Sequence, residues 1–502
     1  MLSTLLVLSL AAAPADAVRA ELQSRWRQRL EPMLSEVLRF PTVEGNAEAF
    51  AAQKSWLARV GPELGLVVRD RETMTELELP GPDGAPVLGL VVHGDVQPVN
   101  ASEWSVAPFS GEVKGGFVWG RGAADDKGPL VQALLVMAAL KSSGLPRTHT
   151  VRLLVGTDEE SGGTDLEAYR KKYPLPDYSL VLDSDFPVVV GEKAWAEWIV
   201  TADERAEPSS GKVEVVDLSA GQAVSIVPDQ ARLVLRWKSG EPDWDRWLTP
   251  VRTAKLPPGT SLQVSGTGAE RTLIAHGRAA HAGIALGRGR NALLALADAV
   301  EGRLPPSAAA DLLAYVHVAG RDPLGGGLGL GMKDPIWGGV ETNFGVVDRG
   351  ADGRLALHVN LRSPPSLWGE ALKARVDENA RAFAGRRGAR FTTGGRFEYE
   401  PYMVPEDSPL VQRLLAAYAR GAGRPAKPVV SAGGTYARRL GAAIAFGMWF
   451  REDGQYPGHA ADERVQIRSL DRGLRVLVEA VVDLATGARL ENPVASRGSA
   501  RP

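Results

Sequence analysis

Three apolar runs in the first half of the chain end in acidic or histidine side chains. The runs are Val87–Val92, Val151–Val155 and Tyr178–Leu182. Short apolar runs bounded by turn residues are typical of strands that are buried on both faces. Helical patterns separate them, at Gly128–Lys141 and Asp165–Lys172. This β-α-β-α-β order predicts an α/β fold whose catalytic domain has a mostly parallel, doubly wound sheet flanked by helices.

The polar side chains after these runs predict a metal site. They are His93-Gly94-Asp95, Asp125-Asp126, Glu159-Glu160 and Asp183, with a distant His459 as a fifth position. A parallel sheet gathers the carboxyl ends of its strands at one edge, where ligands bind. Imidazoles and carboxylates gathered there offer nitrogen and oxygen ligands to divalent metal ions. The chain has seven histidines and no cysteine, which excludes thiolate catalysis and sulfur-ligated zinc. We therefore predict a two-metal hydrolase.

Each cluster also has an ordinary structural explanation. Asp125 or Asp126 could cap the helix that follows, and the Glu159-Glu160 pair could complement a helix dipole. His459 could be a surface loop histidine. Two adjacent aspartates exceed what a cap needs, and one carboxylate can bridge two cations. Adjacent glutamates fit a metal ligand beside a general base. Their repeated placement at strand ends favours the metal site.

The sequence pattern changes after residue 202. A chain of 502 residues is too long for one core. Short strands such as Ala231–Trp237 and Thr272–His276, with a helix at Asn291–Gly302, predict an inserted α+β domain. The predicted organisation is a catalytic domain in two parts, 18–202 and 396–490, an inserted lid domain at 203–395, and a disordered tail at 491–502.

The first 17 residues resemble a signal peptide. The apolar stretch Leu5–Ala13 is too short to span a bilayer, and Ala15-Asp16-Ala17 provides a small-x-small cleavage site. We therefore expect export to the periplasm or the medium. No Lys or Arg precedes the apolar stretch, so a cytoplasmic protein with a frayed N-terminal helix is the alternative. No other segment is long and apolar enough to cross a membrane.

Motifs along almost the whole chain carry a resemblance to a known family. They are His93-Gly94-Asp95-Val96-Gln97-Pro98, Gly120–Pro129, Glu159-Glu160-Ser161-Gly162, Gly433-Gly434-Thr435-Tyr436 and the His459 loop. With them the chain resembles the M20 family of metallopeptidases, and within it the PepV-like or carnosinase-like dipeptidases. The Gly-Arg-Gly-x-x-Asp-Asp-Lys-Gly element is the most specific. The insert, longer than the dimerisation domain of the smaller M20 deacylases, favours the dipeptidase branch.

The resemblance implies two divalent metal ions, zinc in the first place and manganese or cobalt as alternatives. One ion would be held by His93 and Asp183, the other by Glu160 and His459, and both by Asp125. Glu159 would be the general base that activates a metal-bridging water, and Asp95 would orient His93. The Asp125–Asp126 peptide bond would be cis.

The resemblance also implies substrate-binding residues. His281, in the inserted domain, would contact the scissile carbonyl oxygen. Arg362 would clamp the terminal carboxylate of the substrate through its planar guanidinium. The loop of Gly433, Gly434 and Thr435 would add backbone donors. Ser225 stands where these dipeptidases usually carry Asn, which is a departure from the family pattern.

The predicted activity is hydrolysis of dipeptides or short peptides with a free C-terminal carboxylate. The alternative is an M20-type deacylase that cleaves N-acyl amino acids. A catalytically silent scaffold would have lost Glu159 or a ligand, and a glycosidase using Glu159 and Asp183 leaves the histidines unexplained. The net charge of −2 gives no electrostatic basis for binding nucleic acid or a membrane. The expected partner is a small peptide, and the chain is a monomer or a homodimer.

Overall fold

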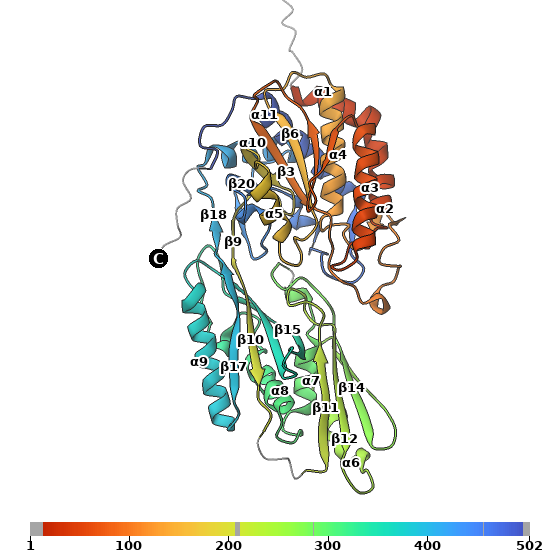
Figure 1. Cartoon of the computed structure of the whole chain (residues 1–502), viewed down its shortest axis with the longest axis vertical. Coiled ribbons are helices and arrows are strands. Elements are labelled where there is room, and N and C mark those ends of the chain that lie inside the picture. Colours follow the sequence, from red (N-terminus) through yellow and green to blue (C-terminus); the bar gives the residue numbers. More distant parts are fainter. Residues whose placement is uncertain (1–13, 206–210, 285, 455, 495–502) are drawn as a thin grey trace, which may run out of the picture.

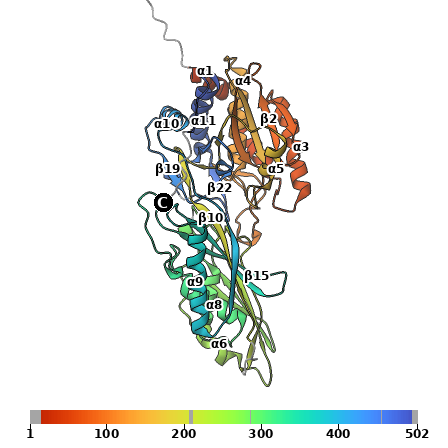
Figure 2. The same ribbon diagram turned by 60° about the vertical axis from the view of Figure 1, so that its left-hand side comes forward.

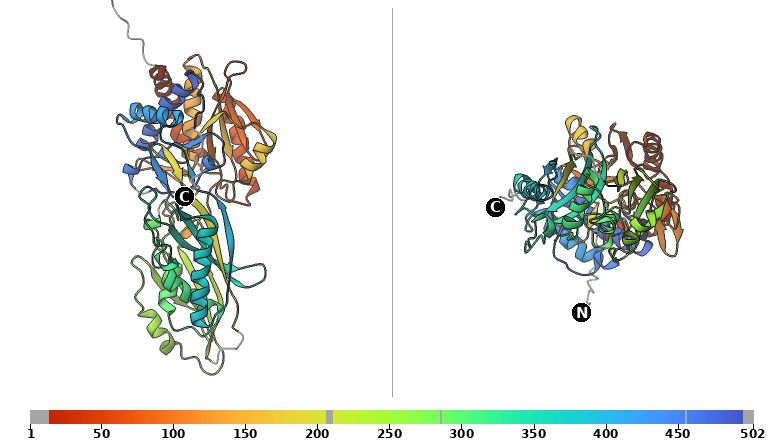
Figure 3. Two further views of the ribbon diagram at one scale, coloured as in Figure 1. Left: turned by 90° about the vertical axis from the view of Figure 1, so that its left-hand side faces the viewer. Right: turned by 90° about the horizontal axis from the view of Figure 1, so that it is seen from below.

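The protein is elongated, with two β-sheets and their helices stacked along the long axis (Figures 1 and 3). The computed structural model describes residues 14–205, 211–284, 286–454 and 456–494. The apolar core of the predicted signal peptide lies outside these residues, so export remains a prediction. Residues 495–502 of the predicted disordered tail also lie outside the described residues. Within the described part of that tail, the Pro493 carbonyl accepts a hydrogen bond of 3.0 Å from the Leu410 amide. Within the described part, no helix has the length and apolar composition of a membrane span.

The first sheet carries the predicted parallel strands at its centre. Its order is β1-β2-β6-β3-β7-β20-β9-β18, and β19 also pairs with β9. The strands are β1 Val67–Asp70, β2 Thr75–Leu79, β3 Val87–His93, β6 Thr150–Gly156, β7 Tyr178–Val181, β9 Val189–Glu192, β18 Tyr402–Met403, β19 Val429–Ser431 and β20 Ala443–Ala445. Strands β6, β3, β7 and β20 run parallel, whereas β1 and β2 on one side and β9 and β18 on the other are antiparallel to their inner neighbours.

Helices cover both faces of this sheet. They are α1 Pro14–Glu21, α2 Leu30–Val37, α3 Ala47–Glu63, α4 Lys127–Ser142, α5 Thr164–Lys172, α10 Pro409–Ala422 and α11 Ile467–Thr486. Adjacent residues of a strand point to opposite faces. In β2, Leu77 packs at Gly61 of α3, whereas Glu76 accepts a hydrogen bond of 2.6 Å from the Tyr169 hydroxyl of α5. The predicted α/β class with a doubly wound sheet is confirmed.

Shorter elements complete this part of the molecule. They are the strands β4 Glu112–Lys114, β5 Phe117–Trp119, β8 Ser184–Asp185, β21 Met448–Trp449 and β22 Arg464–Gln466, and the helical turns η1 Leu22–Trp26, η2 Arg27–Arg29, η3 Ala101–Glu103, η6 Tyr436–Arg438 and η7 Arg451–Asp453. Strand β22 pairs with β5, and β21 with β8. These pairings hold the chain around His459 beside the segments that precede α4 and follow β7.

The second sheet is antiparallel, with the order β13-β14-β12-β11-β15-β16-β10-β17. Its strands are β10 Ala194–Ala202, β11 Val213–Ala220, β12 Gln230–Trp237, β13 Ser261–Ser265, β14 Glu270–His276, β15 Glu341–Arg349, β16 Leu355–Ser363 and β17 Phe391–Tyr399. Its helices are α6 Trp244–Arg252, α7 Ala292–Val300, α8 Ala308–Ala319 and α9 Gly369–Arg387, with the turns η4 Leu286–Arg288 and η5 Gly326–Leu328. Alternate residues of β10 are buried, and α8 and α9 lie beside the strands (Figure 2).

Strand pairing in the second sheet departs from both predicted boundaries of the inserted domain. Strand β10 lies before position 203, yet it pairs with β16 and β17 of the second sheet. Position 395 falls inside β17, where a Cβ on Gly395 would lie 2.0 Å from the Glu197 carbonyl oxygen. The glycine therefore permits a close approach of strands instead of ending the domain. We propose that the inserted domain extends from Ala194 to Tyr399.

Candidate active site

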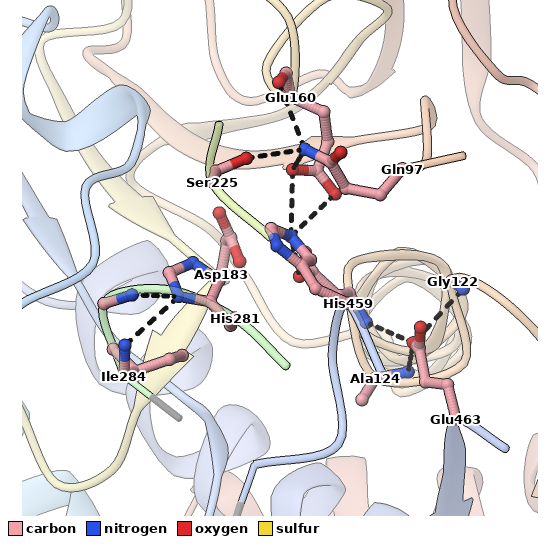
Figure 4. A network of polar contacts seen from close by, with 12 residues as sticks. Gln97, Gly122, Ala124, Glu160, Asp183, Ser225, His281, Ile284, His459 and Glu463 are labelled. Carbon is pink, nitrogen blue, oxygen red and sulfur yellow. Dashed lines mark hydrogen bonds and ion pairs between the residues drawn. The ribbon is translucent and has the colours of Figure 1, made fainter. Parts of the chain in front are cut away.

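The five predicted metal ligands meet at the carboxyl edge of the first sheet. His93 ends β3, Glu160 follows β6, and Asp183 follows β7. Because these three strands are parallel neighbours, their ends deliver the side chains to one place. The loop before β22 brings His459 to the same place from a distant part of the chain, and the segment before α4 brings Asp125 (Figure 4 shows part of the cluster).

Asp125 lies between the two imidazoles. Its Oδ1 is 3.1 Å from His93 Nε2, and its Oδ2 is 3.2 Å from His459 Nε2. His93 Nε2 also lies 3.8 Å from Asp183 Oδ2, and His459 Nε2 lies 3.0 Å from Glu160 Oε2. Two groups of ligands therefore share one carboxylate. The Asp125–Asp126 peptide bond is cis, as the resemblance implied.

The chemistry of this cluster fits divalent cations. Within the described residues, no Lys or Arg forms an ion pair with Asp125, Glu159, Glu160 or Asp183. Burial and then neighbouring carboxylates raise the pKa of Glu159 to about 8, and the same causes raise that of Asp183. Buried carboxylates this close repel one another unless a cation lies between them. Imidazole nitrogens with carboxylate oxygens suit zinc, and also manganese or cobalt.

Ligand atoms converge in two overlapping sets. His93, Asp125 and Glu160 have such atoms within 4.8 Å of one another, and so do His93, Glu159 and Asp183. The second set includes Glu159, for which the sequence predicted the role of base. The structure thus brings this carboxylate to the edge of the cluster.

Asp95 contacts both His93 and the loop of Glu160. His93 Nδ1 lies 3.0 Å from the Asp95 main-chain oxygen and 3.5 Å from its carboxylate Oδ1. Asp95 Oδ2 accepts a hydrogen bond of 2.9 Å from the Glu160 amide. The orientation of the His93 ring thus depends on the backbone of Asp95 as well as on its side chain.

Gln97 is a site residue that the sequence analysis did not assign. Its side-chain amide donates to Glu160 Oε2 at 2.9 Å and to Ser225 Oγ at 3.3 Å (Figure 4). Ser225 belongs to the inserted domain, so this amide connects a predicted ligand to the lid. The position of Gln97 inside the His93–Pro98 motif was the available indication.

Glu463 is a second such residue, four positions after His459. Its Oε1 accepts hydrogen bonds from the amides of Gly122 at 3.1 Å and Ala124 at 2.9 Å (Figure 4). Its Oε2 lies 2.7 Å from the Arg121 guanidinium. Both members of this ion pair are buried. Glu463 therefore fixes the backbone that presents Asp125.

We expect Glu463→Ala to destabilise the protein strongly. Removing one partner of a buried ion pair costs about 3–5 kcal/mol, because the other charge is left unpaired. The free energy of unfolding, measured in urea, should fall by that amount. The matched control is Glu406→Ala, an exposed glutamate without an ion pair in the described residues, which should change stability by less than about 0.5 kcal/mol. Equal stability of the two variants would contradict the role of Glu463.

His281 of the inserted domain lies against the cluster. Its ring centre is 4.4 Å from that of His459. Its Nδ1 accepts hydrogen bonds from the amides of Gly283 at 2.9 Å and Ile284 at 3.1 Å, so the hydrogen of the neutral ring is on Nε2. Burial, and then the positive charges of His459 and Arg362, hold the pKa of His281 well below its usual value. His281 is therefore a neutral donor.

Arg362 lies on β16 and lines a cavity of about 490 Å³ together with Glu159, His281 and His459. Its Nε donates to Asn360 Oδ1 at 2.8 Å, and its other N–H groups have no partner in the described residues. Burial and the neighbouring Arg438 lower its pKa to about 9. A buried guanidinium with free donors offers a site for an anion.

The predicted glycine loop has fewer free donors than expected. Gly434 and Thr435 line the same cavity. The Gly433 amide donates to Ser431 Oγ at 2.9 Å, and the Thr435 amide donates to Glu192 Oε2 at 3.2 Å. Among the described residues, only the Gly434 amide of this loop is without a partner. Fewer donors are free than predicted because Ser431 and Glu192, which lie outside the motif, accept hydrogen bonds from the other two amides.

Comparison with known proteins decides the family. The model of peptidase family M20/M25/M40 matches residues 89–483, which is most of the chain. The chain belongs to this family. The predicted M20 membership and the predicted enzyme class, a metallopeptidase, are confirmed.

Relatives of this M20 peptidase include putative dipeptidase YtjP of Bacillus subtilis, which is 28% identical over 80% of this chain and 84% of its own length. The Beta-Ala-Xaa dipeptidase of Lactobacillus delbrueckii is 28% identical over 80% of this chain and 83% of its own length. Among solved structures, human carnosine dipeptidase 1 aligns with a TM-score of 0.61 at 12% identity, over 94% of this chain and 98% of its own. That alignment shows a shared fold.

Proposed function

We propose that this M20 peptidase hydrolyses dipeptides or short peptides with a free C-terminal carboxylate, using two divalent metal ions. The observation that carries the proposal is Arg362, a buried guanidinium with unused donors in the same cavity as Glu159 and His459. It supplies a site for a terminal carboxylate close to the hydrolytic cluster. The names of the relatives, dipeptidases, support the same substrate class.

The cluster would hold the ions in the arrangement that the resemblance implied. The ligands would be His93 and Asp183 for one ion, Glu160 and His459 for the other, and Asp125 for both. Zinc is the proposed ion, with manganese or cobalt as alternatives. Two such ions, when bound, lower the pKa of a water molecule and polarise the carbonyl of the substrate.

Glu159 would act as the general base. Its carboxylate is close to the ligand atoms of His93 and Asp183, and no hydrogen bond within the described residues occupies it. Burial and the neighbouring carboxylates raise the pKa of Glu159, and cations bound beside it would oppose that rise and keep the carboxylate ionised, as a proton acceptor must be. The carboxylate takes a proton from the attacking water and passes it to the leaving amine.

His281 would donate to the carbonyl oxygen of the scissile bond. Its Nδ1 is fixed by two backbone amides, so Nε2 remains as the donor. A donor that is already oriented stabilises the charge that develops on this oxygen without reorganisation.

Arg362→Met should remove the preference for a free carboxylate. We expect kcat/KM for Ala-Ala to fall about 10²-fold, because a bidentate charged contact is lost. Hydrolysis of Ala-Ala amide should be slow in the wild type and unchanged in the variant, which controls for folding. Steady-state kinetics on both peptides measures the effect. An equal loss for Ala-Ala and its amide would contradict the carboxylate clamp.

The experiment that separates peptidase from deacylase is a substrate panel with the metal-loaded enzyme. We expect kcat/KM to be higher for dipeptides than for N-acetyl amino acids or for peptides longer than three residues. A preference for N-acetyl amino acids would instead establish the deacylase, which could use the same cluster and the same base.

A further inference from the structure

Four arginines, including Arg362, line one wall of the proposed substrate cavity. They are Arg362, Arg396, Arg438 and Arg439. Two of them stack on aromatic side chains of the lid: Arg396 lies 5.0 Å from the ring centre of Trp195, and Arg439 lies 4.8 Å from that of Tyr399. The two rings contact each other edge to face at 5.4 Å. This wall joins strands β10 and β17 to the segment at η6 of the catalytic domain.

Two of these guanidiniums are neutralised within the protein. Arg396 lies 3.0 Å from the Glu197 carboxylate, and Arg438 lies 3.1 Å from that of buried Glu192. Arg438 also donates to the Lys193 carbonyl at 3.0 Å. Because each of these guanidiniums is paired with a carboxylate, neither provides a net positive charge for binding a substrate.

The other two carry an unbalanced charge. Within the described residues, neither Arg362 nor Arg439 has a carboxylate at ion-pair distance. Arg439 donates only to the carbonyl oxygens of Gly162 at 2.8 Å and Gly163 at 3.1 Å. Five N–H donors belong to each guanidinium, so three remain on Arg439 and four on Arg362.

Two unbalanced positive charges in one cavity match a ligand with two carboxylates. A dipeptide with a neutral C-terminal residue has one, which Arg362 is proposed to hold. An aspartate or glutamate at that position adds the second. A charge pair formed at the partly buried Arg439 contributes more than a pair fully exposed to water.

We propose that Arg439 forms a subsite for an acidic side chain, so that the preferred substrates are dipeptides ending in Glu or Asp. This inference rests on the proposed function, because it assigns the α-carboxylate to Arg362. The Gly162 and Gly163 carbonyls hold the Arg439 guanidinium next to the loop of Glu159, while Tyr399 covers one face of it.

The test compares Ala-Glu with Ala-Gln, which have nearly the same shape but differ in charge. For the metal-loaded wild type we expect kcat/KM for Ala-Glu to be about tenfold or more above that for Ala-Gln. Arg439→Gln should bring this ratio close to one while Ala-Gln hydrolysis is retained. Arg439→Lys keeps the charge and should keep most of the preference. Arg396→Gln is the matched control, because its charge is already paired, and it should leave the ratio unchanged.

A wild-type ratio of one or less would overturn the subsite, and so would a ratio that survives in Arg439→Gln. Product binding, measured by calorimetry, separates this result from failure of the proposed function. Tighter binding of glutamate than of glutamine, lost in Arg439→Gln, would support the subsite even in an enzyme that cleaves neither peptide. Equal binding of the two amino acids in the wild type would contradict it.

Discussion

Replacing Glu159 by Gln should lower kcat for dipeptides by about 10²- to 10⁴-fold without loss of metal. The amide keeps the shape of the side chain but cannot accept the proton of the attacking water. In the wild type the Glu159 carboxylate lies beside the ligand atoms of His93 and Asp183, where it can take that proton. Dipeptide kinetics together with the metal content of the purified variant measures both parts of the expectation.

Glu44→Gln is the matched control, because this exposed acid lines the same cavity. Its kcat and metal content should remain those of the wild type. Activity of Glu159→Gln within tenfold of the wild type would contradict the general-base role. Loss of a metal equivalent in that variant would instead make Glu159 a ligand, as its closeness to the ligand atoms of His93 and Asp183 allows.

His281→Ala should lower kcat by about 10²- to 10³-fold with little change in KM. The neutral imidazole would donate to an oxygen whose negative charge develops only in the transition state, so its loss affects the chemical step more than binding. Since the pKa of His281 is held well below its usual value, this donor should stay neutral as the pH falls through 6.5. Steady-state kinetics between pH 6 and 8 tests both points.

His317→Ala provides the control for His281. His317 also belongs to the inserted domain, where its ring lies 2.7 Å from Asp298, and it does not line the cavity. Its replacement should leave kcat unchanged. A His281→Ala enzyme with a normal kcat and a raised KM would show that this ring binds the ground state and the transition state equally, which would contradict its role as a transition-state donor.

The position of the metal cluster could be predicted because most of its residues follow neighbouring strands of the sheet. Strands β3, β6 and β7 are short, largely apolar segments, and parallel pairing brings the residues after each strand to one edge. No comparable pattern gives the contacts of Gln97 or Glu463. Each depends on a partner from another part of the chain, such as Ser225 or Gly122, which spacing along the sequence cannot supply.

The inserted domain shows where sequence patterns are insufficient. Helix α8, Ala308–Ala319, was not predicted, because it is buried on nearly all sides and therefore lacks an amphipathic pattern. Strands β10 and β17 are far apart in the sequence, and only their pairing assigns both to the second sheet. Arg439 likewise acquires its surroundings from Tyr399 and Gly162, which no local pattern links to it.

Re-supplying Zn²⁺ to chelator-stripped enzyme is the most direct test of a two-metal peptidase centre formed by His93, Asp125, Glu160, Asp183 and His459. Dipeptide hydrolysis should be absent without metal. It should recover on titration and reach its maximum at two equivalents of Zn²⁺ per chain, with the bound metal measured in the same samples. Full activity in the stripped enzyme, or a maximum at one equivalent, would contradict this assignment.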